Sequence, residues 1–181
     1  MAEVLFINGD YIKRNSQLNG SVDDNYAFPM ITLAQDKHVQ LYLGTSLFEK
    51  LKSDIEGDTL TGAYQTLVND HVRKVTLWWT LVEWLPKMHV RVDNGGLVIR
   101  TSEDSQPITR ADLNREMDSA RNNAQFYTER MIAYLCNNTT SFPEYNNNTD
   151  DQIRPFKSAF YEAGTEIQGR SPRDIDPIYR T

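Results

Sequence analysis

The chain has 181 residues, of which 39% are hydrophobic and 24% are charged, and its formal net charge is −6 at pH 7. These proportions are those of an ordinary globular domain and exclude a chain that is disordered throughout. No stretch approaches the roughly 20 apolar residues that a membrane span requires, and the first residues lack the features of a signal peptide. The acidic balance argues against tight binding to nucleic acid, which needs clustered Lys and Arg.

The first sixty residues predict an apolar extension followed by two helices. Val4–Ile7 is a short apolar run that can form either a strand or an anchoring extension. The spacing of the apolar residues then predicts two helices that each end at a glycine, namely residues 23–44 and residues 45–57.

The next helix is expected to dominate the fold. It runs from Thr61 to Leu85, and Pro86 is expected to end it. Its apolar stripe is wide and contains all three tryptophans, Trp78, Trp79 and Trp84. Burying one Trp removes about 150–250 Å² from water. We therefore expect this helix at the centre of its domain or at a subunit interface.

A short β-hairpin and a final helix are expected to follow. Residues 88–100 alternate in polarity, and Asn94-Gly95 between β-branched residues predicts a hairpin turn. A lone hairpin is marginally stable in water, so another element should pack on it. Thr109 and Asp112 resemble a capping box that begins a helix ending near Asn137. The predicted fold is mainly α, a four-helix bundle-like domain with one small β-hairpin.

The composition changes after Tyr145. Residues 146–151 are rich in Asn and Asp and predict a solvated linker, and residues 152–181 contain prolines without a sustained period. We divide the chain into a helical domain, residues 1–145, and an extended C-terminal arm, residues 146–181, and expect a cut after Tyr145 to leave the helical domain folded. The apolar residues of the arm are expected to bind a partner: Phe156, Phe160, Tyr161, Ile175, Ile178 and Tyr179.

The sequence offers little catalytic chemistry. His38 and His71 lie on apolar helix faces, which favours hydrogen-bonded core histidines over metal ligands. Glu83 precedes Lys87 by four residues, a spacing that favours an ion pair. Cys136 is the only cysteine, so an internal disulfide is excluded, and we expect a small buried side chain. We predict no catalytic residue, no metal and no cofactor.

Three basic residues bring positive charge to the hairpin region of this acidic chain: Lys87, Arg91 and Arg100. They can form a solvated face of the hairpin. Alternatively, they can contact an acidic neighbour or a passing phosphate backbone and so line a channel or an interface.

Short motifs of packing and turn residues stand in a fixed order along residues 2–145: Ala34-Gln35-Asp36, Leu43-Gly44-Thr45, Leu47, Leu51, Leu60-Thr61-Gly62, Trp78-Trp79-Thr80-Leu81, Thr101-Ser102-Glu103, the helix from Ala124 to Tyr134, and Phe142-Pro143-Glu144-Tyr145. In this order they resemble the head–tail connector family of tailed bacteriophages, most closely the connectors of crAss-like phages of Bacteroidetes. More distantly, the plan is similar to that of the helical head–tail adaptors of long-tailed phages.

The resemblance implies a non-enzymatic structural protein of the virion, a subunit of a dodecameric ring at the portal vertex that joins the DNA-filled head to the tail. The implied partners are copies of the chain itself, the portal protein and the next neck or tail ring protein. DNA would pass through the ring without sequence-specific binding, and no membrane would be involved. Assembly would occur in the host cytoplasm, and the finished ring would lie at the head–tail junction.

Three alternatives remain open at this point. The chain can be another completion ring of the neck or tail. An enzyme or enzyme accessory would require His71 and Glu83 to converge in a pocket. A DNA-binding regulator would require a basic recognition helix, whereas the candidate helices mix Arg and Lys with Asp and Glu.

Overall fold

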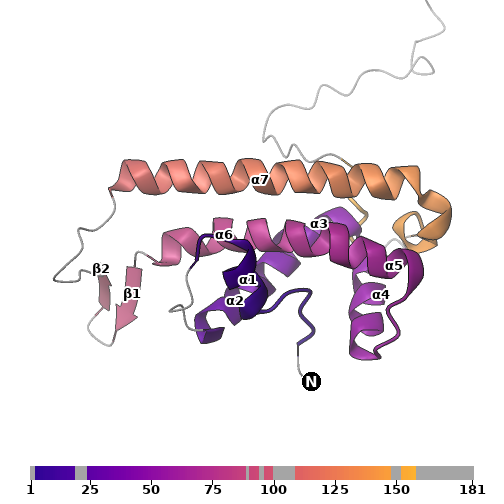
Figure 1. Ribbon diagram of the computed structural model, residues 1–181, viewed down its shortest axis with the longest axis horizontal. Coiled ribbons are helices and arrows are strands. Elements are labelled where there is room, and N and C mark those ends of the chain that lie inside the picture. The colour runs from indigo at the N-terminus through magenta and orange to yellow at the C-terminus, as the bar shows by residue number, and fades with distance from the viewer. Residues whose placement is uncertain are drawn as a thin grey trace, which may run out of the picture.

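A computed structural model describes residues 3–18, 24–88, 90–93, 96–99, 109–147 and 152–157. The fold is mainly helical, as the sequence predicts. Its long helices α6 (Arg73–Met88) and α7 (Arg110–Asn137) lie side by side along the longest axis (Figure 1). Helix α2 (Asp24–Ala34) packs against the opposite side of α6, and α1 (Gly9–Asn15) packs on α2.

The remaining elements are short and connect these helices. In chain order they are η1 (Gln35–Val39), α3 (Gln40–Leu43), α4 (Thr45–Glu56), α5 (Gly62–Thr66), η2 (Leu67–Val72), β1 (Val90–Asp93), β2 (Gly96–Ile99), η3 (Thr139–Ser141) and η4 (Pro143–Tyr145). The elements η1 and η2 are π-helical turns, and η3 and η4 are 3₁₀ turns.

Two of the expected helices are each continuous through a π-helical turn. The helix that begins with α2 continues through η1 and α3 and ends at Gly44, whose φ of 76° ends the helical backbone conformation. The helix that begins with α5 continues through η2 and α6 to Met88. Pro86 therefore lies inside the last turn of α6, contrary to the expectation that it ends the helix. Proline can adopt a helical φ, and it removes only one backbone hydrogen-bond donor. In the last turn of a helix this loss is small enough that Lys87 and Met88 continue the helix after Pro86.

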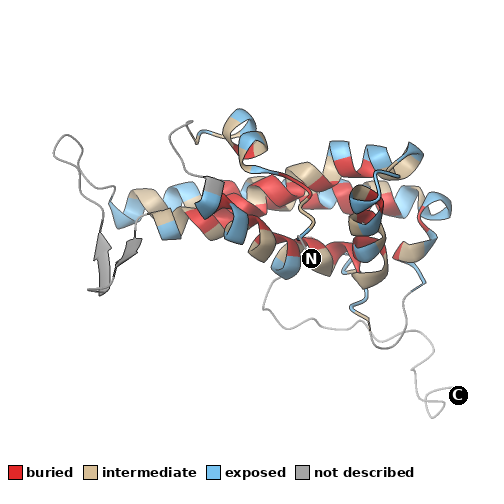
Figure 2. Ribbon diagram, turned by 90° about the horizontal axis from the view of Figure 1, so that it is seen from below, coloured by how far each residue is buried: buried red, intermediate tan, exposed pale blue. Residues whose placement is uncertain are grey.

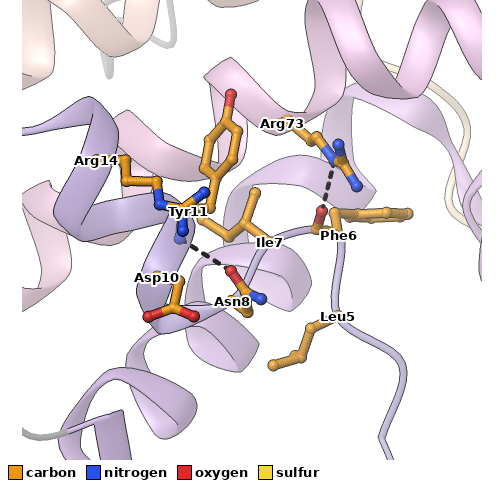
Figure 3. Close-up of a pocket in the computed structure, with 8 residues that line it drawn as sticks. All are labelled: Leu5, Phe6, Ile7, Asn8, Asp10, Tyr11, Arg14 and Arg73. Carbon is orange, nitrogen blue, oxygen red and sulfur yellow. Dashed lines mark hydrogen bonds between the residues drawn. The ribbon is translucent and has the colours of Figure 1, made fainter.

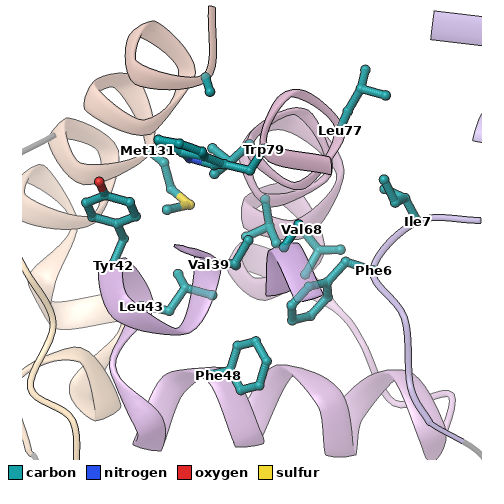
Figure 4. Packing of buried hydrophobic residues seen from close by; sticks show 14 of the residues in the cluster. Phe6, Ile7, Val39, Tyr42, Leu43, Phe48, Val68, Leu77, Trp79 and Met131 are labelled. Carbon is teal, nitrogen blue, oxygen red and sulfur yellow. The ribbon is translucent and has the colours of Figure 1, made fainter. Parts of the chain in front are cut away.

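The buried side chains form one contiguous core that runs along α6 (Figure 2). Figure 4 shows how Trp79 of α6 faces Met131 of α7, while Phe6 and Phe48 close the core from the N-terminal extension and from α4. The rings of Phe6 and Phe48 meet edge to face, with their centroids 5.5 Å apart. The wide apolar stripe of the predicted dominant helix is thus buried within its own domain.

The N-terminal extension is held by side chains that hydrogen-bond to its backbone. The buried amide of Gln35 accepts from the Phe6 N–H at 2.7 Å and donates to the Val4 carbonyl at 3.2 Å. The Nε of Arg73 donates to the Phe6 carbonyl at 3.2 Å. These bonds replace a strand partner, so residues 4–7 form the anchoring extension and not a strand.

The ends of α7 agree with the sequence. Thr109 Oγ1 accepts from the Asp112 N–H at 3.2 Å and donates to the Asp112 carboxylate at 2.6 Å. Thr109 is therefore the N-cap of α7, while the Asp112 carboxylate bonds to the Thr109 hydroxyl and not to the backbone N–H that the N3 residue of a capping box binds. The helix ends at Asn137.

Strands β1 and β2 pair antiparallel beyond the end of α6, with Val90 opposite Ile99 and Val92 opposite Leu97 (Figure 1). Among the described helices, none is both long enough and apolar enough to cross a membrane.

We predict that Trp79→Ala lowers the free energy of unfolding by about 3–5 kcal/mol, because it opens a cavity in the core. Trp79 is 7% exposed, whereas Trp78 is only half-buried, so Trp78→Ala should cost less. The surface control is Tyr26→Ala, since Tyr26 is 68% exposed. Urea denaturation measures all three variants, and equal midpoints for Trp79→Ala and Tyr26→Ala would show that α6 is not the centre of the core.

Candidate interaction site

The first part of the C-terminal arm binds across the corner between α3 and α4. The Thr45 N–H donates to the Ile153 carbonyl at 3.0 Å, and the Ile153 N–H donates to Thr45 Oγ1 at 3.1 Å. The Phe156 N–H donates to the Leu41 carbonyl at 2.9 Å. Residues 153–157 have no regular secondary structure, so this contact uses backbone groups of a non-helical segment.

These bonds satisfy backbone groups that the two helix ends leave open. A helix has no internal partner for its first N–H groups and its last carbonyls. Thr45 is the first residue of α4, which has no side-chain cap, and Leu41 lies in the last turn of α3. The arm therefore caps both ends at once.

Side chains add to this contact. Ser46 Oγ donates to the Gln152 side-chain oxygen at 2.5 Å. Within the arm, Lys157 Nζ donates to the Asn146 side-chain oxygen at 3.3 Å. Ile153 and Phe156 nevertheless remain 45% and 38% exposed. The arm thus uses its backbone on its own domain and leaves apolar side chain surface accessible.

The predicted partner-binding residues are only partly described. Phe156 is exposed on the bound part of the arm. Phe160, Tyr161, Ile175, Ile178 and Tyr179 lie outside the described residues.

The predicted basic residues are likewise described in part. Lys87 is exposed in the last turn of α6, and the backbone of Arg91 pairs with that of Val98 in the β1–β2 ladder. Arg100 lies outside the described residues.

Glu83 joins α6 to η1. Its Oε1 accepts from Lys37 Nζ at 2.7 Å and lies 2.8 Å from His38 Nε2. The expected partner, Lys87, is therefore wrong. The π-helical turn of η1 brings Lys37 and His38 to the Glu83 carboxylate instead. A carboxylate only accepts, so neutral His38 carries its proton on Nε2.

The His38 ring also stacks on Trp79, with the centroids 3.9 Å apart and the planes within 10°. Burial lowers the pKa of His38, although the Glu83 carboxylate opposes that shift. The pKa of Glu83 is lowered as well, because the hydrogen bonds from Lys37 and His38 outweigh its partial burial. Both pKa values therefore favour neutral His38 beside ionised Glu83 near neutral pH.

His71 lies in a separate contact. Its ring stacks on Tyr134 of α7 with the centroids 4.4 Å apart, and burial lowers its pKa. Glu83 and His71 thus have different aromatic and polar neighbours and are not joined in one site. Within the described ranges, no three His, Cys, Asp or Glu side chains lie together as metal ligands would.

Cys136 is exposed near the end of α7, so the expectation of a buried side chain is wrong. The apolar positions Met131, Ile132 and Leu135 occupy the buried face of this turn, and Cys136 follows them onto the outer side. Helical position decides its exposure more than side-chain type does.

A feature that the sequence did not reveal is a cavity of about 390 Å³ beside α1, which we call the α1 cavity (Figure 3). It is lined by Leu5, Phe6, Ile7, Asn8, Asp10, Tyr11, Arg14 and Arg73. The Arg73 guanidinium lies 5.8 Å from the centre of the Tyr11 ring, and burial raises the pKa of Tyr11 despite this cation. Arg14 and Arg73 are 59 positions apart in sequence order, so only the tertiary fold could bring them together.

We predict that acid destabilises the chain in part through His38. A histidine whose folded pKa is lowered gives stability that is complete above its ordinary pKa of 6.5 and is lost as the pH falls below that value. The lowered pKa of Glu83 acts in the same direction below 4.5. His38→Phe keeps a ring on Trp79 but cannot titrate, so its stability should fall less than that of the wild type between pH 7.5 and about 5.

His71→Phe removes a second histidine with a lowered pKa and leaves the His38–Glu83 contact intact, so its effect on the pH dependence should be separate from that of His38→Phe and should add to it. Chemical denaturation at a series of pH values measures the free energy of unfolding of each protein. Parallel curves for wild type and His38→Phe would show that His38 does not carry the pH dependence.

Comparison with known protein families matches residues 39–154 to the Family of unknown function (DUF6712). Comparisons with curated proteins and with solved structures found no match. The matched range begins at Val39, the last residue of η1, and so contains Glu83 but not its partners Lys37 and His38. It covers most of the helical domain and ends within the part of the arm that binds α3 and α4. Because the match covers more than half of the chain, this protein belongs to the DUF6712 family.

Proposed function

We propose that the chain is a structural subunit of the head–tail connector of a tailed bacteriophage, forming a ring at the portal vertex. In this proposal residues 1–145 form a four-helix bundle-like body with a small β-hairpin, and residues 146–181 form the arm that joins the body to another molecule. The partners are copies of the chain, the portal protein and the next neck or tail ring protein.

The observation that carries the proposal is the apolar side-chain surface that the described part of the arm leaves exposed. Residues 152–157 cap α3 and α4 through backbone groups, while Ile153 and Phe156 keep exposed apolar surface. Extended segments of this kind bind partners through their backbone and through alternate side chains. The sequence after Lys157 continues with further apolar residues, namely Phe160, Tyr161, Ile175, Ile178 and Tyr179.

Exposed aromatic residues on the helices add further support. Tyr26 and Phe28 on α2 are 68% and 46% exposed, and Phe126 on α7 is 51% exposed. Aromatic residues are enriched in protein interfaces. A ring needs two different faces on each subunit, because neighbours in a cyclic assembly contact each other heterologously.

The charge of the chain fits a channel through which DNA moves. A net charge of −6 on each copy is multiplied around a ring. Such a field repels the phosphate backbone and so prevents DNA from binding to the channel wall.

Negative-stain images and native mass of the full chain, with and without the portal protein, test the proposal. We expect closed rings, and we expect them to seat on the portal. A chain that remains a monomer in both conditions and shows a hydrolytic activity would support the enzyme alternative instead.

We predict that a cut after Lys157 leaves helix content and melting temperature unchanged and abolishes attachment to the portal or to neighbouring rings. A cut after Tyr145 should additionally lower stability by about 1–2 kcal/mol, because it leaves the helix-end groups at Leu41 and Thr45 without their partners. This replaces the expectation from sequence that a cut after Tyr145 is harmless. Circular dichroism and co-sedimentation with the portal separate the two effects, and a Lys157 truncation that still joins the particle would show that the arm is passive.

We predict that reversing Lys87, Arg91 and Arg100 to Glu spares folding and lowers the yield of infectious particles. The proposed cause is the loss of contact with an acidic neighbour or with DNA in the channel. The matched control reverses Lys74, Arg110 and Arg115. Thermal denaturation and particle counts measure the two outcomes, and a normal particle yield from the Lys87, Arg91 and Arg100 variant would refute the role of these residues.

A further inference from the structure

The α1 cavity carries two guanidinium groups with unused hydrogen-bond donors. Arg73 uses its Nε for the Phe6 carbonyl, which fixes the direction of its side chain. Within the described part of the chain, its two terminal nitrogens and the whole Arg14 guanidinium donate to no acceptor. Arg14 is exposed at the last turn of α1.

This chemistry suits a carboxylate-bearing peptide. Guanidinium groups bind carboxylates through paired, charge-assisted hydrogen bonds. Leu5, Ile7 and Tyr11 add apolar wall, and Asp10 places one carboxylate at the same cavity. A fitting ligand therefore alternates acidic and apolar side chains and carries a cation beside them. The long-range repulsion from a chain of net charge −6 disfavours a nucleic acid here.

One segment of the C-terminal arm has this composition, Arg173-Asp174-Ile175-Asp176-Pro177-Ile178-Tyr179. In an extended peptide Asp174 and Asp176 lie on the same side, roughly 7 Å apart. Pro177 restricts the free peptide and so reduces the entropy lost on binding.

We propose that residues 173–179 of one copy bind in the α1 cavity of a second copy, with Asp174 and Asp176 at Arg14 and Arg73 and with Arg173 at Asp10. The chain between Lys157 and Asp174 spans up to roughly 55 Å when extended, which is enough to reach past the body of its own domain. The contact joins two different faces and therefore continues from copy to copy around a ring. It rests on the proposed function in one respect, that the arm leaves its own domain to join another molecule.

Sedimentation velocity of full-length variants over a range of concentrations tests the contact. Arg14→Glu, and separately the double change Asp174→Arg and Asp176→Arg, should each weaken self-association at least about tenfold. Combining all three changes should restore part of the association, because the new carboxylate at position 14 then meets a new guanidinium of the arm, while Arg73 still opposes the other one. Arg110→Glu and Glu166→Arg are matched controls on the body and the arm and should associate as the wild type does.

Mixing the two weakened variants separates a second copy from the same copy. The Arg14→Glu chain keeps a wild-type arm, and the Asp174→Arg, Asp176→Arg chain keeps a wild-type cavity, so the mixture should associate although each variant alone does not. Arms that bind only their own cavity gain nothing from mixing. Absence of association in the mixture, a wild-type chain that stays monomeric at every concentration, or association that the variants leave unchanged would each overturn the inference.

The test does not depend on the portal. Self-association through the arm that is accompanied by no binding to the portal would refute the connector and keep this contact. If rings bind the portal and the changes at Arg14, Asp174 and Asp176 do not affect them, the connector proposal is supported and the arm contact is refuted.

Discussion

The fold depends on the burial of Trp79 between two segments that are far apart in sequence. Its indole N–H donates to Thr128 Oγ1 of α7 at 3.1 Å, and its ring face stacks on His38 of η1. Thr128 is itself held by a hydrogen bond to the Ala124 carbonyl at 2.7 Å. One side chain thus fixes α6 against both α7 and η1, and the π-helical turn at η1 then brings Lys37 and His38 to Glu83. The apolar stripe was predictable from the sequence, but the aromatic and polar contacts of Trp79 come from the tertiary packing.

Because the arm caps α3 and α4, the folded unit extends beyond the boundary at Tyr145 that the composition suggests. Composition separates the arm from the body after Tyr145, yet Ile153 and Phe156 satisfy helix-end groups at Thr45 and Leu41. The DUF6712 match ends at residue 154, within this contact. The bound part of the arm is therefore part of the folded body in energetic terms. Its exposed Ile153 and Phe156, together with residues beyond Lys157, supply the proposed partner contacts. A polar segment of low complexity can thus precede a segment that the domain needs.

Much of the helical fold was predictable, because glycines, the N-cap and helical spacing act locally. The ends at Gly44 and Asn137 and the start at Thr109 needed only neighbouring residues. Pro86 was misjudged because a proline near a helix end costs one hydrogen bond and does not always end the helix. The α1 cavity could not be predicted, because Arg14 and Arg73 are far apart in sequence and line the same cavity only through the tertiary fold. The partners of Glu83 could not be predicted for the same reason. Local spacing indicated Lys87, whereas tertiary packing places Lys37 and His38 beside the Glu83 carboxylate.

We propose that the helical body folds without a partner and that the C-terminal arm binds another molecule. Amide hydrogen exchange of the full chain, measured alone at low concentration and again in the assembled ring on the portal, tests it most directly. We expect the amides around Trp79 to be protected from exchange in both states, and residues 158–181 to gain protection only on assembly. Equal protection of residues 158–181 in the two states, or protection of α6 that appears only in the ring, would contradict this proposal.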